Sequence, residues 1–114
     1  RLGPERIGYL FPLSHVFAVC PPEQVLTQLR RCAAEIVSFN LCGCRRSGPG
    51  PRARTIALPL DEGDLQLAPV CAVLAAAGYA GDLIVQGHGW TQGADGLRRS
   101  LSTLLAITSS PHPL

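Results

Sequence analysis

Three polar side chains that could meet a small substrate lie at, or just beyond, the ends of short apolar runs. They are His15, Asn40 and Gln86. If the runs are parallel strands, these side chains reach the carboxyl edge of a sheet, which is where α/β enzymes place their catalytic groups. Two of the three are amides, which hydrogen-bond a ligand but cannot act as general bases near neutral pH. The residue types therefore favour hydrogen bonding over proton transfer at this edge.

For other polar residues near this edge, two interpretations stay open. His15 either orients a substrate hydroxyl or is a structural, hydrogen-bonded histidine. His88, between two glycines, either contacts a ligand or is an exposed loop residue. Trp90 either stacks on a ligand or packs at the rim of the fold. Glu62 and Asp64 form a small acidic pair for which capping or turn chemistry outweighs catalysis.

Cys42-Gly43-Cys44 is a competing signal. Two thiolates near His15 and Cys20 could hold zinc, or the pair could act as a redox dithiol. The spacing is not Cys-x-x-Cys and no second pair follows, so both interpretations are weaker than the strand-end one. The five cysteines are an odd number without the spacing of a disulfide framework. We therefore expect a reduced, cytoplasmic protein without a metal site.

The elements that must position these residues alternate between strands and helices. We expect strands near residues 6–11, 35–41 and 82–86, and the continuous apolar run of the first is typical of a strand buried on both faces. We expect a helix that opens at Pro21-Pro22 and another that starts near Pro69 and ends at Gly78. Strands that alternate with helices predict parallel pairing.

The remaining segments complete this prediction. A last helix has Asp95 as its N-cap and a leucine face, formed by Leu97, Leu101, Leu104 and Leu105. Residues 43–54 are rich in Gly, Pro and Arg, so we expect a loop there, without helix or central strand, followed by an extended segment at 55–58. Residues 108–114 are expected to form a disordered tail.

Length and composition exclude several classes of protein. The 114 residues allow one domain, and the net charge of +2 is too small to indicate a nucleic-acid partner. No apolar run approaches the roughly 18 residues that span a bilayer, so no membrane partner is expected. The chain begins with Arg1 and contains no methionine. We expect it to be a piece of a longer open reading frame.

Two segments resemble a known family of barrels. Residues 59–65 read Pro-Leu-Asp-Glu-Gly-Asp-Leu, which is similar to the Pro-Leu-Gly-Glu-Gly-Asp loop of the xylose-isomerase-like barrels. Residues 76–81 are similar to the helix ending of that family, Gly-Tyr-Asp-Gly before a strand. The superfamily includes sugar-phosphate isomerases and epimerases, inosose dehydratases and DNA-repair endonucleases. The resemblance implies that residues 5–107 are three β/α units, the carboxyl-terminal part of an incomplete parallel (β/α)8 TIM-type barrel.

The resemblance also implies a set of strand-end ligands. In the family, carboxylates and a histidine hold one divalent cation of the manganese, magnesium or zinc type, which stabilises an enediolate. The matching positions in this chain are Pro12, Asn40 and Gln86, in place of Asp, His and the Glu that moves the proton. Because none of the three is a carboxylate, we expect no metal and no other cofactor in this chain.

These observations predict a relative of sugar (phosphate) isomerases and epimerases that is inactive as the chain stands. Gln86 and Asn40 occupy the catalytic positions, and His15, His88 and Trp90 are the expected substrate-binding residues. The alternative is a truncated or non-catalytic barrel remnant with a weak polyol-binding or purely structural role. A small sugar or polyol is the expected partner, and open barrel edges predict self-association.

Overall fold

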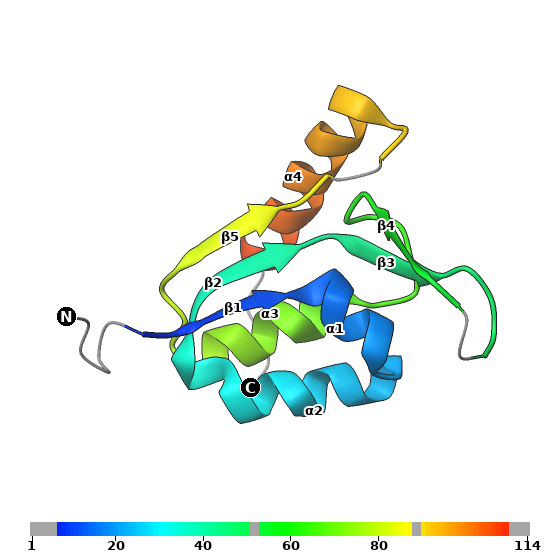
Figure 1. Cartoon of the computed structure of the whole chain (residues 1–114). Coiled ribbons are helices and arrows are strands. Elements are labelled where there is room, and N and C mark those ends of the chain that lie inside the picture. The colour runs from blue at the N-terminus through cyan, green and yellow to red at the C-terminus, as the bar shows by residue number, and fades with distance from the viewer. Residues whose placement is uncertain (1–6, 51–52, 88–89, 110–114) are drawn as a thin grey trace.

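Three apolar runs form a parallel sheet, as the alternation of strands and helices predicts. β1 (Tyr9–Pro12), β2 (Ile36–Leu41) and β5 (Asp82–Val85) lie in the order β1-β2-β5, so β2 is the central strand (Figure 1). The computed structural model describes residues 7–50, 53–87 and 90–109. Within those residues the sheet stays open and forms no closed barrel.

Helices cover one face of this sheet. Figure 1 shows α1 (Leu13–Val19), α2 (Pro22–Cys32) and α3 (Leu67–Ala76) along the same side of the three strands. Two phenylalanines of the sheet point toward them: Phe11 and Phe39 are register partners, and their rings stack with centroids 5.1 Å apart. Both rings belong to the buried core. The core of the fold therefore lies between one face of the sheet and these helices.

An irregularity in β2 determines which of its residues enter this core. Tyr9 pairs with Ile36 but Leu10 pairs with Ser38, so Val37 is an extra residue between two ladder positions. A bulge of this kind places two consecutive side chains on the same side of the strand. Ile36 can therefore be buried although it is three residues from buried Phe39, while Val37 remains 60% exposed.

The opposite face of the sheet is uncovered. Leu10 is 53% exposed, and Ile84 on the other edge strand is 44% exposed. Burial of the first strand on both faces, predicted from its apolar run, is therefore wrong. An apolar run suits a strand that is covered on both faces, but α1, α2 and α3 all lie on the same side of this sheet.

Proline and glycine set the ends of two helices as predicted. Pro22 occupies the first turn of α2, where a backbone N–H has no acceptor within the helix, so its absence costs no hydrogen bond. Gly78 takes a left-handed conformation (φ +74°) after α3. The amides of Gly78 and Tyr79 donate to the carbonyls of Ala75 and Leu74, which closes the helix in a Schellman arrangement.

Helix α1 was not predicted. It begins directly after Pro12 and buries Leu13 and Phe17, which are four residues apart on one helical face. Its end has a sequence cause, since Cys20 precedes a proline and adopts the extended conformation that this position favours. Seven residues are too few to show a clear helical period, so the segment resembled a strand end followed by a loop.

The expected loop 43–54 contains a strand, which corrects the prediction. β3 (Gly43–Arg46) pairs antiparallel with β4 (Thr55–Leu58), the extended segment that was predicted. The two strands form a separate hairpin next to the end of β2 (Figure 1). Glycine at position 43 serves this packing, because a side chain there would collide with the carbonyl oxygens of Pro59 and Glu62.

The last helix, α4 (Gly93–Ser109), differs from the prediction in three ways. Asp95 lies in its first turn and is not the N-cap. Its packed face contains Ser100, Leu104 and Ile107, whereas Leu97, Leu101 and Leu105 of the predicted leucine face are exposed. Thr108 and Ser109, predicted as tail, are helical, and residues 110–114 lie outside the described part. None of the helices in that part combines the length and apolarity that crossing a bilayer requires.

One pair of variants tests the one-sided core. Phe39→Ala removes a fully buried ring and should lower the free energy of unfolding by about 3–5 kcal/mol. Val37→Ala, two residues earlier on the same strand, should lower it by less than about 1 kcal/mol because that side chain is exposed. Urea denaturation monitored by circular dichroism measures both. Equal losses would show that both faces of the sheet contribute to the core.

Candidate functional site

The three strand-end positions lie together, as predicted. Pro12, the last residue of β1, is the register partner of Asn40 in β2. Gln86 follows β5 directly, and its amide N–H donates to the carbonyl of Leu41 at 2.8 Å. All three therefore lie at the carboxyl edge of the parallel sheet. Whether they act on a ligand stays a prediction.

Asn40 is the most informative of the three. It alternates with the buried residues Phe39 and Leu41, so its side chain leaves the sheet on the face that the helices do not cover. Its Oδ1 atom is nevertheless buried and accepts no hydrogen bond within the described residues. A buried carbonyl oxygen without a donor is uncommon in folded proteins. The Asn40 oxygen is thus a hydrogen-bond acceptor that no donor satisfies within the described residues.

The strand-end residues do not fit the divalent cation of the family that the sequence resembles. Pro12 offers no ligand atom, and Asn40 and Gln86 offer only neutral amide oxygens. Manganese and magnesium sites in proteins depend on carboxylates. In the described part of the chain, no group of three or more His, Cys, Asp or Glu side chains is arranged to hold a metal. No reaction step that needs a cation can therefore be derived from these residues.

His15 does not belong to the strand-end cluster. Because α1 begins at Leu13, His15 lies on an exposed side of a helix and not at the end of a strand. It lines an open cavity of about 580 Å³ between α1 and β4, together with Ser14, Arg54 and Thr55 among others. The residues that line this cavity do not include Asn40, Gln86 or Trp90. The predicted placement of His15 at a strand end is wrong, because it lies in a helix, while its substrate-binding role stays a prediction.

Trp90 packs at the rim of the fold. A side-chain carbon at Gly87 would lie 3.1 Å from its ring, and one at Gly96 would lie 3.4 Å from it. The indole therefore fills the angle between the end of β5 and the first turn of α4, which agrees with the packing interpretation. Its Nε1 is buried without a hydrogen-bond partner among the described residues. His88, the other expected contact from this loop, lies outside the described residues.

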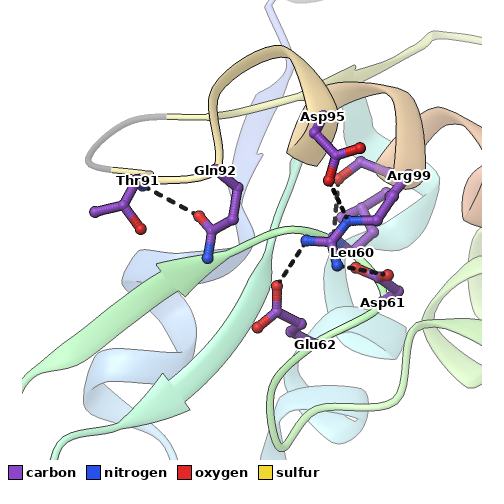
Figure 2. A network of polar contacts seen from close by, with 8 residues as sticks. Leu60, Asp61, Glu62, Thr91, Gln92, Asp95 and Arg99 are labelled. Atoms are coloured by element: carbon purple, nitrogen blue, oxygen red, sulfur yellow. Dashed lines mark hydrogen bonds and ion pairs between the residues drawn. The ribbon is translucent and has the colours of Figure 1, made fainter.

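A polar cluster next to this rim was not predicted. Figure 2 shows the Arg99 guanidinium between three carboxylates, with nitrogen–oxygen distances of 3.5 Å to Asp61, 3.0 Å to Glu62 and 3.4 Å to Asp95. The neighbouring Ser100 is fully buried, and its hydroxyl accepts the N–H of Leu60 at 3.0 Å. Two consecutive residues of α4 thus hold the loop that follows β4.

The other side of this loop contacts β3. The amide of Asp64 donates to the carbonyl of Cys44 at 2.7 Å, and its carboxylate accepts the N–H of Arg46 at 3.4 Å. Gly63 has φ +103° and packs directly on the backbone of Cys44, so a side chain there would be both strained and obstructed. These contacts support the turn interpretation of Glu62 and Asp64 over a catalytic one.

The spacing of Asp95 and Arg99 was the only sequence signal for this cluster. Opposite charges four residues apart on a helix face form ion pairs, but they do not reveal a third partner from a distant loop. Nothing in the sequence singled out Ser100. Comparison with protein-family models, with curated proteins and with solved structures finds no match for this chain.

The role of Arg99 can be measured with its neighbour as the control. Arg99→Gln should lower the free energy of unfolding by about 1 kcal/mol, because its carboxylate partners are partly exposed and such pairs are weak individually. Arg98→Gln removes the same charge from an exposed position and should change stability by less than about 0.5 kcal/mol. The difference between the variants should shrink in concentrated salt, which screens charges. Indistinguishable urea curves would show that the cluster contributes nothing.

Proposed function

We propose that this chain is the carboxyl-terminal, non-catalytic part of a barrel of the sugar isomerase and epimerase type, and that it recognises a sugar or polyol. Three features support the proposal. The sheet is parallel with helices on one face, the segments 59–65 and 76–81 resemble that family, and the strand ends meet at one edge. A piece of a barrel would show this arrangement, with the uncovered face directed toward the barrel interior.

The observation that carries the proposal is the unpaired oxygen of Asn40. A buried acceptor without a donor costs a folded protein about 1–3 kcal/mol. A ligand hydroxyl is a donor of suitable size, and a polyol has several. The amide of Gln86, on the neighbouring strand end, can donate to and accept from the next hydroxyl of the same ligand. Recognition by two neutral amides requires no cation.

The same residues explain why the proposed role is not catalytic. Isomerisation and epimerisation next to a carbonyl require a base that removes a proton from carbon. Amides do not accept protons near neutral pH, and Pro12 has no functional group. The edge therefore retains the shape and hydrogen-bonding capacity of a sugar site without the charge needed for the reaction.

The single asparagine of the chain allows a direct test. In protein labelled with ¹⁵N-asparagine, the side-chain NH₂ resonances report on Asn40 alone. Titration with a polyol such as xylitol should shift these resonances in a saturable manner, with a dissociation constant near the millimolar range that a few hydrogen bonds support, about −4 kcal/mol. Gln86→Ala should weaken the response, whereas Gln66→Ala, at an exposed position before α3, should not.

Manganese provides the second arm of this experiment. Because the edge lacks carboxylates, the paramagnetic ion should broaden the Asn40 resonances only at concentrations that also broaden exposed acidic residues, which are observed in a second, uniformly ¹⁵N-labelled sample. A polyol shift that is absent, or that survives Gln86→Ala unchanged, contradicts recognition by the two amides. Strong selective broadening of Asn40 by manganese contradicts the metal-free site.

The uncovered face supports the alternative role, in which the chain acts by association. The apolar residues there are Leu10, Val37 and Ile84, on all three strands. Apolar faces with unpaired strand edges beside them promote contacts between chains. In this role the segment contributes a surface and binds no small molecule.

Sedimentation velocity tests the association. The chain should show a sedimentation coefficient that rises with concentration, and Val37→Lys should restore the monomer because it places a charge on the central strand, among the exposed apolar residues. Val19→Lys, at an exposed position on α1, should leave the association unchanged. A monomer at every concentration, stable and cooperative in unfolding, would contradict an exposed barrel interior.

A further inference from the structure

Two cysteine thiols lie next to each other in the core, where the chain passes from β2 to β3. The Sγ atoms of Cys42 and Cys44 are 3.5 Å apart, and the two residues are 1% and 0% exposed. Residues two apart in an extended chain project to the same side, so the contact follows from the local backbone. The intervening Gly43 fits beneath the carbonyls of Pro59 and Glu62, which leaves little freedom to separate the sulfurs.

The backbone of the pair is held from outside. The Cys44 carbonyl accepts the amide of Asp64 at 2.7 Å, and Gly63 packs against the same peptide. Arg99 and Ser100 hold the other end of this loop through Glu62 and Leu60. The thiols are thus positioned by a chain of contacts that reaches α4. Such positioning favours reaction between them, because two groups held in contact react far faster than free ones.

The surroundings make the two sulfurs unequal. The pKa of Cys42 is lowered, chiefly by its hydrogen bond with the Cys44 thiol and further by one with the Ser14 side chain. Burial raises the pKa of Cys42 but does not outweigh these hydrogen bonds. The hydrogen bond between the two thiols and burial raise the pKa of Cys44. Cys42 is therefore the sulfur that more readily becomes a thiolate, the form that reacts with oxidants. Burial alone raises the pKa of Cys71, and it is the largest cause of the raised pKa of Cys32, so both thiols are less reactive.

We propose that Cys42 and Cys44 form a redox site that hydrogen peroxide, or another small hydroperoxide, converts to a disulfide. The Cys42 thiolate attacks one peroxide oxygen, the O–O bond breaks, and hydroxide leaves as Cys42 becomes a sulfenic acid. The Cys44 sulfur then attacks Cys42 Sγ and gives up its proton, and the sulfenic oxygen leaves as water. In total two thiols lose two hydrogens and one peroxide becomes two waters.

The geometry determines the oxidant and the reversibility. Because the pair has almost no exposed surface, large disulfides such as oxidised glutathione are excluded, and the proposed oxidant must be as small as a peroxide. The bond requires the sulfurs to approach by about 1.5 Å. A ring that encloses a single residue gains little from loop closure and is strained, which makes such a disulfide easy to reduce. The site is therefore a reversible modification site and not a structural crosslink.

Mass spectrometry of the folded chain after peroxide treatment tests the proposal. The intact mass should fall by two hydrogen atoms, with Cys42 and Cys44 linked in the peptide map, and dithiothreitol should restore the original mass. In Cys44→Ser, Cys42 should instead gain one oxygen and react with dimedone, since no second thiol resolves the sulfenic acid. In Cys42→Ser, oxidation at the remaining thiol should be slower, because burial still raises the pKa of Cys44 and lowers its thiolate fraction.

Three outcomes would overturn the proposal. The first is oxidation of Cys20 before the intact mass falls by two hydrogen atoms. The second is a disulfide that involves Cys20, Cys32 or Cys71. The third is a Cys42–Cys44 pair that stays reduced at peroxide concentrations that oxidise free cysteine. Far-UV circular dichroism confirms that each variant is folded. If a serine variant does not fold, the peptide map of the unmodified chain still decides, because it names the two linked residues directly. The result does not depend on whether the strand-end amides bind a polyol.

Discussion

The arrangement of this protein depends on a sheet that is packed on one face only. Three parallel strands need crossover helices, and in the described part of the chain these lie on the side to which Phe11, Phe39 and Leu41 point. Every alternate residue is thereby assigned to the other face, where Leu10, Asn40 and Ile84 lie. This division decides the role of each strand residue. Side chains on the covered face stabilise the core, and side chains on the uncovered face are available to contact a ligand or another chain. Asn40 is a candidate recognition residue because of this division, more than because of its chemistry.

A second constraint is the loop between β4 and α3, which connects parts of the fold that the sheet does not join. On one side it meets Arg99 and Ser100 of α4, and on the other it meets the backbone of Cys44. The carboxylates of this loop follow a strand, yet their hydrogen bonds and ion pairs are made within the protein. An acidic loop after a strand is thus not evidence of catalysis until the positively charged side chains that pair with it are located. Here the cation is Arg99, and it comes from a helix more than thirty residues away in the sequence.

The parts of the fold that could be predicted from sequence are those fixed by local chemistry. Apolar runs located the three strands, Pro22 and Gly78 located helix ends, and alternation of element types predicted parallel pairing, so that Pro12, Asn40 and Gln86 were placed correctly at one edge. Features that depend on distant partners were missed. Helix α1 is stabilised by burial of Leu13 and Phe17, but its seven residues show no clear helical period in the sequence, which is why His15 was misplaced. The burial of Ser100 and the exposure of Leu97 and Leu101 depend on where α4 docks, and no pattern within the helix records that.

The end of β2 brings the two candidate chemistries within a few residues of each other. Asn40 points to the uncovered face, Leu41 points into the core and accepts the amide of Gln86, and Cys42 begins the thiol pair. The Cys44 backbone is held by the loop through Asp64, so closing a disulfide would move the peptides between Leu41 and Cys44. The Leu41 carbonyl accepts the Gln86 amide, so the proposed oxidation and the proposed recognition share one segment of backbone. Any coupling between the two would alter both to the same degree in free energy, as linkage requires.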